Sequence, residues 1–373
     1  MVQPAITGSG VFTPPQVISN EELVAAYNAH AEAFNARHAD AIAAGEADAK
    51  PLSSSEFILN ASGIERRHVM DKAGVLDPDV MHPVLRERRD DEPGIMAEIA
   101  LDACGTALAQ AGREAGEIDL VICAASNHER PYPAIAIEIQ QLLGAGGFAF
   151  DMNVACSSAT FGIQAAADMI RAGSAHRALV VSPEICSGHL EWRDRDCHFI
   201  FGDVCTALVI EAAEEAQGAH FRILSTRCAT QFSNNIRNNN GFLRRTRPGH
   251  MEDRRDMLFV QEGRRVFKEV LPLVSAHIAG HLGEAGVTPS GLRRLWLHQA
   301  NKAMNDFIGR KVMGRVPGVH EQPNILQDYA NTSSAGSIIA FSQYSDDLAP
   351  GERGLICSFG AGYSVGSVLV ERG

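Results

Sequence analysis

An internal duplication constrains the fold of this chain more than any other feature of its sequence. Residues 105–127 align without a gap on residues 279–301, and each segment reads as a helix end, an Ala-Gly stop, a polar turn and an apolar strand. Two further pairs match in the same order: 155–158 with 330–333, and 201–211 with 359–371. One such match between Ala- and Gly-rich junctions is unremarkable by chance, but three in order indicate two related halves.

Apolar strands alternate with helical patterns in both halves, as RALVVSPE and GLICSFG do with ATFGIQAAADMIRAG. This alternation predicts βα units and a mainly parallel sheet buried on both faces, in an α/β protein. We expect an N-terminal half over residues 1–213 and a C-terminal half over residues 214–373. Pseudo-symmetric packing of the halves would bring Cys156 close to Asn331, because the two residues occupy the same position of the repeat.

Three segments interrupt the repeat. Residues 23–50 are rich in Ala with Glu, His and Asp and predict an inserted amphipathic helix, whereas the Pro- and charge-rich residues 73–93 predict a loop. Residues 228–257 contain NNIRNNN and LRRTRPGH and predict a long irregular segment. Segments of this kind often shape the entrance to a site.

Composition excludes several classes of protein. The 373 residues are 45% hydrophobic and 21% charged, which is typical of a globular chain with two packed units. A formal net charge of −12 argues against nucleic-acid and membrane partners. The beginning lacks a basic segment followed by an apolar run, and no stretch of 18 apolar residues occurs, so we expect a cytoplasmic location. The eight cysteines include no CxxC pair, which predicts neither a disulfide framework nor a metal site.

Cys156 lies where an extended apolar strand gives way to small residues and then to a helix. A thiol at that junction faces the helix N-terminus, whose partial positive charge favours the thiolate, so Cys156 is a candidate nucleophile. The alternative is a small buried apolar residue, which fits the other seven cysteines well.

Three further features gain meaning beside that thiol. His298 closes an apolar strand, where a lone histidine is more often a satisfied core residue. Asn331 takes the place of Cys156 in the second half; its amide can donate to a carbonyl or enolate oxygen, although alone it would read as a helix N-cap. The turn CSFGAGYSVGS, with Gly360 and Ala361, is either a simple hairpin or a set of backbone N–H groups for an oxyanion.

Together these residues resemble the β-ketoacyl-ACP synthase III family of thiolase-fold condensing enzymes, over nearly the whole chain. The segments that carry the resemblance are ITGSGVFTPPQVISNEEL (6–23), SGIERRH (62–68), the Cys156 segment (148–170), DRDCHFIFGD (194–203), EGRRVFKEV (262–270), HQAN (298–301), NTSSAGS (331–337) and FGAGYSVGS (359–367). The resemblance implies two duplicated halves in an α-β-α-β-α arrangement.

The family's Cys-His-Asn triad falls on Cys156, His298 and Asn331. Elongating synthases use two histidines instead, and thiolases use a second cysteine in the C-terminal glycine turn, which here begins with Phe359. Both relatives are therefore disfavoured. The resemblance implies that Cys156 takes an acyl group from acyl-CoA, and that His298 and Asn331 then stabilise the enolate formed when malonyl-ACP loses CO2. The oxyanion would rest on the N–H groups of Cys156 and Ala361, and no cofactor is implied.

The resemblance also assigns substrate contacts. The aromatic residue and one Arg that hold the CoA adenine fall on Phe57 and Ala61, so CoA binding is rearranged, although Arg195 keeps its place. The acyl-pocket aromatic, contributed across a homodimer interface, falls on Tyr132, with Phe359 gating the pocket. With the insertions, this suggests a medium-chain acyl-CoA such as octanoyl-CoA rather than acetyl-CoA.

Docking of the acidic acyl carrier protein requires basic residues, and the family's docking positions fall on Lys268, Arg310 and Lys311. The alternative is ordinary solvated helix charge. Three other functions stay open: a related synthase with a CoA-bound or other acceptor in secondary metabolism, a Cys-His-Asn hydrolase, and an idle acyl-binding scaffold.

Overall fold

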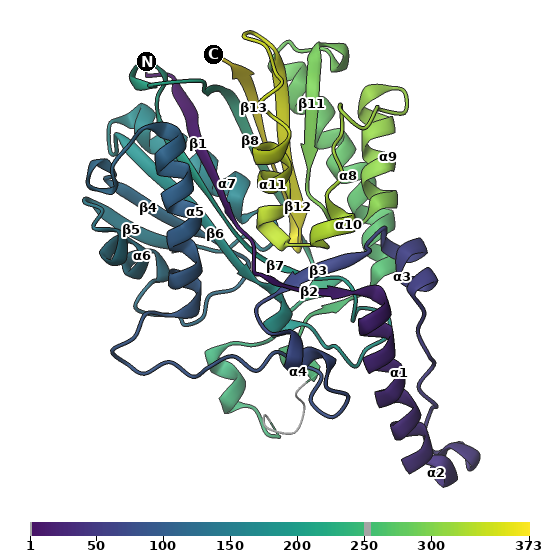
Figure 1. The fold of residues 1–373 in the computed structure, drawn as a ribbon. Coiled ribbons are helices and arrows are strands. Elements are labelled where there is room, and N and C mark those ends of the chain that lie inside the picture. The colour runs from purple at the N-terminus through teal and green to yellow at the C-terminus, as the bar shows by residue number, and fades with distance from the viewer. Residues whose placement is uncertain (1, 250–254) are drawn as a thin grey trace.

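A computed structural model describes residues 2–249 and 255–373, and it is built on one nine-stranded sheet with the order β11-β12-β13-β8-β1-β7-β6-β4-β5 (Figure 1). The strands are β1 (Pro4–Phe12), β4 (Leu120–Ala124), β5 (Phe148–Met152), β6 (Arg177–Ile185), β7 (Asp203–Ala212), β8 (Phe221–Ser233), β11 (Leu292–Leu297), β12 (Arg353–Gly360) and β13 (Gly362–Arg372).

The strand order repeats between the two halves. In the first half β4 runs parallel to β6, and the pairs β6–β7 and β7–β1 are antiparallel. In the second half β11 runs parallel to β12, and the pairs β12–β13 and β13–β8 are antiparallel. The halves join where β1 pairs with β8. The predicted duplication is confirmed, whereas the boundary between residues 213 and 214 stays a prediction. The expectation of a mainly parallel sheet is wrong, because five of the eight strand pairs in the described sheet are antiparallel where β1, β7, β8 and β13 join the halves.

Helices form three layers around the two halves of the sheet (Figure 1). Buried residues of α5 and α6 pack on β4, β6 and β7, and those of α8 and α9 pack on β11 to β13. Between the halves, α7 and α11 fill a shared apolar core. These helices are α5 (Ile95–Ala111), α6 (Ile135–Leu143), α7 (Ser158–Ala172), α8 (Gly263–Glu284), α9 (Lys302–Met313) and α11 (Gly336–Gln343). The arrangement is the expected α-β-α-β-α layering.

Glycines in β1 permit the close approach of α5. A Cβ atom on Gly8 would lie 2.0 Å from the carbonyl oxygen of Ala107, and one on Gly10 would lie 2.0 Å from that of Ala103. No side chain fits there, so the sequence TGSG of the first strand sets how tightly the outer helix layer packs.

The predicted helix in residues 23–50 is right for residues 23–43. Its first turn carries a capping box between Ser19 and Glu22. The predicted loop at 73–93 is irregular after residue 76. The elements of this region are β2 (Gln16–Ser19), α1 (Asn20–Arg37), α2 (Ala39–Ala43), α3 (Ser55–Ser62), β3 (Arg66–Val69) and α4 (Lys72–Leu76).

The prediction of an irregular segment at 228–257 is wrong for residues 228–233, because β8 continues to Ser233 and pairs there with Gly362 of β13. Residues 250–254 of that segment lie outside the described residues. The remaining elements are β9 (Ile236–Arg237), β10 (Val260–Gln261), α10 (Leu326–Tyr329), and the 3-10 helices η1 (Ala115–Glu117), η2 (Cys186–His189), η3 (Ala213–Glu215), η4 (Phe242–Thr246), η5 (Arg255–Met257), η6 (Pro289–Gly291) and η7 (Ser333–Ala335). Among the described helices, none combines the length and apolar character needed to cross a membrane.

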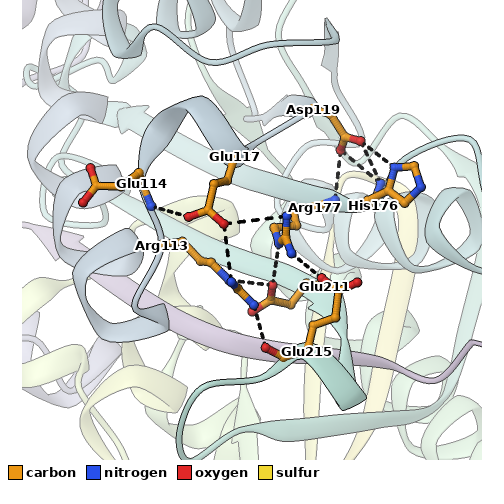
Figure 2. Close-up of polar contacts among 8 residues, drawn as sticks. All are labelled: Arg113, Glu114, Glu117, Asp119, His176, Arg177, Glu211 and Glu215. Carbon is orange, nitrogen blue, oxygen red and sulfur yellow. Dashed lines mark hydrogen bonds and ion pairs between the residues drawn. The ribbon is translucent and has the colours of Figure 1, made fainter.

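An ion-pair network closes one end of the sheet, where β6 begins and β7 ends (Figure 2). The buried carboxylate of Glu211 accepts hydrogen bonds from Nε of Arg113 at 2.9 Å and from Nε of Arg177 at 3.0 Å. Both arginines reach further carboxylates or carbonyls around it. The opposite end of β6, at Glu184, leads to the candidate site.

Candidate active site

A cavity of about 670 Å³ collects the predicted reactive residues from both halves of the chain. Cys156 lies before α7 and His298 directly follows β11, whereas Asn331 lies in the loop before η7. All three line the cavity, as do Phe359 and Gly360 at the end of β12. Segments more than 170 residues apart thus meet where the two halves meet.

Backbone geometry presents the Cys156 thiol to the cavity. Ala155 has a left-handed backbone with φ of 48°, as its repeat counterpart Ala330 does with φ of 56°. The hydroxyl of Ser333 lies 3.4 Å from Sγ of Cys156. A Cβ atom on Gly360 would lie 2.6 Å from Cβ and 3.0 Å from Sγ of Cys156, so only glycine fits against the thiol.

Burial decides the protonation of this thiol. It raises the pKa of Cys156 to about 11, and the charge of Glu184 acts in the same direction. The Ser333 hydroxyl and the backbone N–H groups of Ala361 and of Cys156 itself lower the pKa by less. The expectation that the helix N-terminus makes Cys156 a thiolate is therefore wrong for the resting protein, because desolvation of the anion outweighs the local donors.

His298 is a neutral imidazole at physiological pH. Burial lowers the pKa of His298 to about 4, opposed in part by the backbone of Ser333. Its backbone N–H donates to the carbonyl of Cys357 at 2.7 Å, and its ring meets the edge of Phe359 with centroids 5.2 Å apart. A neutral ring can donate one hydrogen bond to a substrate without carrying a charge into the cavity.

Asn331 is held by its backbone on both sides. Its N–H donates to the carbonyl of Ile200 at 2.9 Å, and its carbonyl accepts from Gly202 at 3.1 Å. The side-chain Oδ1 accepts the N–H of Ser333 at 2.9 Å. Within residues 2–249 and 255–373 no acceptor takes the hydrogens of Nδ2, so that group can donate to a ligand.

Comparisons with known proteins agree with this geometry. Family models for 3-oxoacyl-[acyl-carrier-protein] synthase III match residues 150–231, and residues 282–372 match the model of its C-terminal part. The chain is 54% identical over 347 residues to a β-ketodecanoyl-[acyl-carrier-protein] synthase of Pseudomonas aeruginosa, covering 93% of this chain and 99% of that protein. It is 30% identical over 385 residues to a β-ketoacyl-[acyl-carrier-protein] synthase III of Bordetella petrii, covering 100% of this chain and 98% of that protein.

The chain belongs to the β-ketoacyl-ACP synthase III family. It is a condensing enzyme of the acyltransferase class, and this excludes the hydrolase alternative. Solved structures show the same fold: the synthase III of Aquifex aeolicus superposes with a TM-score of 0.76 at 23% identity over 99% of both chains. The priming β-ketosynthase of the R1128 polyketide pathway gives a TM-score of 0.76, also at 23% identity, over 99% of this chain and 96% of that chain.

The two residues expected to hold CoA in this synthase already touch each other. Phe57 lines the cavity, and the guanidinium of Arg195 lies 3.8 Å from the centroid of its ring. Nε of Arg195 donates to the carbonyl of Leu52 at 2.7 Å. A neighbouring cavity of about 610 Å³, lined also by Lys50, opens beside Arg195. An aromatic and a cation thus stand between the reactive cavity and a more open one.

The remaining predicted contacts lie outside the reactive cavity of the single chain. Tyr132 is 81% exposed in the loop between β4 and α6, so nothing in one chain brings it to the thiol. Lys268 is exposed on α8, and Arg310 and Lys311 are exposed at the end of α9, which packs on α8. These three basic residues are accordingly exposed on the outer helix layer of the second half.

Cys123, His128 and Asp151 lie close enough for one metal ion, with their donor atoms within 4.8 Å of one another. The Asp151 oxygens, however, accept the N–H groups of Ile135 and Ala136 at the start of α6. Burial raises the pKa of the Cys123 thiol well above its ordinary value. The chemistry of this cluster therefore fits a helix cap better than a metal site.

Sequence reasoning missed Glu184, Ser333 and Ser334. Glu184 is fully buried on β6 beside the cavity, and burial raises its pKa to about 7 despite hydrogen bonds from Ser126 and Ser334. No local pattern in VVSPEIC marks a functional carboxylate. Ser333 and Ser334 belong to the NTSSAGS motif, in which the sequence points to Asn331 as the functional residue.

Proposed function

We propose that the protein condenses a medium-chain acyl-CoA, octanoyl-CoA in preference to acetyl-CoA, with malonyl-ACP to form a β-ketoacyl-ACP. The reaction would start fatty acid synthesis through an acyl thioester on Cys156. The observation that carries this proposal is the single cavity that holds Cys156, His298 and Asn331 between apolar walls. The aliphatic and aromatic side chains of those walls are Phe57, Ile64, Phe199, Ile200, Phe201, Ile236, Phe259, Val260, Val266, Phe267, Val270, Met304 and Phe359.

In the first half-reaction Sγ of Cys156 attacks the thioester carbonyl of the acyl-CoA. The carbonyl oxygen becomes an oxyanion that accepts the N–H groups of Cys156 and Ala361, which already face the sulfur. The intermediate collapses with cleavage of the bond to the CoA sulfur. The proton lost from Cys156 leaves with CoA, so acyl-Cys156 and free CoA are the products.

In the second half-reaction the ring N–H of His298 and Nδ2 of Asn331 donate to the thioester carbonyl of the malonyl group. The bond to the carboxylate breaks, CO2 leaves, and the electron pair forms an enolate held by those two donors. The enolate carbon attacks the acyl carbonyl on Cys156, whose sulfur departs as a thiolate and takes a proton from solvent. A histidine with a pKa of about 4 suits this role, because its neutral ring donates a hydrogen bond to the enolate oxygen and does not transfer a proton to it.

The chain length of the primer is inferred from the apolar walls and from a relative. The Pseudomonas aeruginosa relative at 54% identity is named for a β-ketodecanoyl product. Ten carbons minus the two that malonyl contributes leave an eight-carbon primer. Intact-protein mass spectrometry after incubation with acetyl-, butyryl-, octanoyl- and decanoyl-CoA tests this, with Cys156→Ser as control. Preferential acylation by acetyl-CoA would refute the medium-chain primer. Equal acylation of Cys156→Ser would refute the role of Cys156 as nucleophile.

For the nucleotide end of CoA we assign Phe57 and Arg195 as contacts. The stacked pair lies at the border of the reactive cavity, where a planar base can lie against either group. Phe57→Ala should raise KM for octanoyl-CoA several-fold and leave KM for octanoyl-pantetheine, which lacks the nucleotide, unchanged. An equal change with both substrates would show that Phe57 shapes only the inner cavity.

For acyl carrier protein we assign the basic surface of Lys268, Arg310 and Lys311. Exposed Phe267 and Phe307 on the same helices add apolar area for a partner. The triple charge reversal to Glu should raise KM for malonyl-ACP at least about tenfold at low salt and leave Cys156 acylation unchanged. Activity of the unaltered enzyme with malonyl-CoA or acetyl-CoA exceeding that with malonyl-ACP would favour the alternative acceptor.

A homodimer completes the proposal, because it could bring Tyr132 of one subunit to the acyl pocket of the other. The high exposure of this aromatic side chain in a single chain supports that view. Sedimentation equilibrium measures the oligomeric state, and Tyr132→Ala should change the primer preference in the mass-spectrometry panel. A monomeric protein, together with an unchanged primer preference in Tyr132→Ala, would refute a role for Tyr132 across a dimer interface. The cytoplasmic location and the absence of a cofactor stay predictions.

A further inference from the structure

Segment 330–334 contains Asn331 and positions it together with the other two reactive residues of the cavity, Cys156 and His298. The hydroxyl of Ser333 lies 3.4 Å from Sγ of Cys156, and its N–H donates to Oδ1 of Asn331. The backbone of Ser333 also raises the pKa of His298, against the larger lowering by burial. A shift of Ser333 therefore reaches Asn331 most directly, because the N–H of Ser333 holds the amide oxygen of that residue.

This support holds a conformation that its residues do not favour on their own. Ala330 and Ser333 both have left-handed backbones, with φ of 56° and 51°, which side chains with a Cβ adopt at a cost of about 1 kcal/mol or more each. Such a backbone conformation persists only where surrounding contacts hold it in place.

Glu184 supplies the strongest anchor next to Ser333. The backbone N–H of Ser334 donates to Oε1 of Glu184 at 3.2 Å, and the Ser334 hydroxyl donates to the same oxygen at 2.5 Å. The hydroxyl also lies 3.2 Å from the carbonyl of Ala124. Ser334 is completely buried and Glu184 is 1% exposed, so water does not compete for these bonds.

The same carboxylate is fixed from the other half of the fold. Ser126, which follows β4, donates its N–H to Oε1 at 2.9 Å and its hydroxyl to Oε2 at 2.6 Å. Ser126 after β4 of the first half and Ser334 in η7 of the second half thus donate four hydrogen bonds to one carboxylate. Glu184 joins the halves directly beneath the cavity.

We propose that Glu184 is a positioning residue for the condensation, fixing through Ser334 the segment that holds Asn331 and Ser333 against the thiol. The proposal rests on the proposed function of this site. Glu184 lines no wall of the cavity, and its hydrogen bonds to segment 330–334 run through Ser334.

Positioning by Glu184 should separate the two half-reactions. Acylation of Cys156 uses N–H groups of Cys156 and Ala361, neither of which belongs to segment 330–334. Decarboxylation of the malonyl group needs Asn331 and His298, whose alignment depends on that segment. A displacement of about 1 Å in donor positions can cost a factor of about 100 in rate, so loss of the anchor should fall on decarboxylation.

The test compares both half-reactions in purified variants: Cys156 acylation by octanoyl-CoA followed by mass spectrometry, and CO2 release from malonyl-ACP. We expect Glu184→Ala to lose at least about 30-fold in CO2 release with acylation within about threefold. Ser334→Ala, which removes one hydroxyl, should lose about tenfold in CO2 release. This milder variant tests the positioning role of Glu184 even where Glu184→Ala does not fold. Glu184→Gln should recover activity to within about fivefold, because its amide oxygen can face Ser334 while its NH2 group faces Ser126.

Ser337→Ala is the matched control, since Ser337 is a buried serine three residues further whose hydroxyl bonds, among residues 2–249 and 255–373, only Ser358. It should leave both half-reactions unchanged. Equal losses in the two half-reactions of Ser334→Ala, or no loss in either, would overturn the inference. Failure of the proposed function would look different: the unaltered enzyme would show neither acylation nor CO2 release.

Discussion

The buried carboxylate of Glu184 should make the stability of the protein depend on pH. Burial raises the pKa of Glu184 from 4.5 to about 7 in the folded protein. A carboxyl group with a raised folded pKa contributes stability that is fully present below pH 4.5 and is lost as pH rises through 7. At about 1.4 kcal/mol for each pKa unit, the loss amounts to about 3 kcal/mol.

Replacing Glu184 with Gln isolates this loss, because the amide keeps the shape and does not titrate. We expect the free energy of unfolding of Glu184→Gln, relative to the unaltered protein, to increase by about 2.5 kcal/mol between pH 5 and pH 8. Comparing the difference at two pH values cancels the constant effect of the amide. It also cancels Asp203, a second fully buried carboxyl group, whose pKa burial raises to about 6 in both proteins.

Urea unfolding followed by tryptophan fluorescence measures this difference. The chain has two tryptophans, and both Trp192 and Trp296 are fully buried, so their emission reports loss of the cores around them. Parallel pH dependences of the two proteins would refute the reasoning, since they would mean that Glu184 titrates alike in the folded and unfolded chains.

Three further outcomes follow from the geometry. Gly360→Ala should slow Cys156 acylation by at least about 100-fold in the mass-spectrometry assay, because the new methyl group would lie 2.6 Å from Cβ of Cys156. Glu211→Gln should lower the free energy of unfolding by about 3 kcal/mol in urea and leave kcat unchanged, because it leaves Arg113 and Arg177 without their buried counter-ion. Inactivation of the unaltered enzyme by iodoacetamide should accelerate about tenfold for each pH unit from 7 to 10, as a thiol with a pKa of about 11 requires; a plateau near pH 8 would contradict this.

The duplication made the core of the fold predictable from sequence. Matching strand ends place residues of the same repeat position at the same edge of each half-sheet, so Cys156 and Asn331 could be expected to meet. The left-handed Ala155 and Ala330 before them show that the repeat extends to the backbone. His298 needed the family resemblance, because nothing local separates it from a core histidine.

Two expectations failed because they used local information where distant contacts decide. Residues 228–233 look irregular in sequence, yet they form the end of β8 because β13 pairs with them. The helix N-terminus near Cys156 predicted a thiolate, but burial of the sulfur raises its pKa more than the Ser333 hydroxyl and the neighbouring backbone N–H groups lower it.

Glu184 could not be found from sequence because its partners are remote. Ser126 lies 58 residues before it and Ser334 lies 150 residues after it. A single carboxylate at a strand end reads as an edge residue, and only the packing of the two halves turns it into a buried acceptor of four hydrogen bonds.

The desolvation that keeps the resting thiol protonated also bears on the order of the proposed reaction. Acyl-Cys156 is neutral, whereas return of the acyl group to CoA would expel Cys156 as a thiolate into a cavity that disfavours that charge. In the proposed reaction, burial would thus keep the acyl group on Cys156 until the malonyl thioester arrives. The carbon attack must expel the same sulfur, but there the loss of CO2 drives the step and makes it irreversible. A cavity that makes a poor thiolate is therefore consistent with a nucleophile whose task is to carry an acyl group between two substrates.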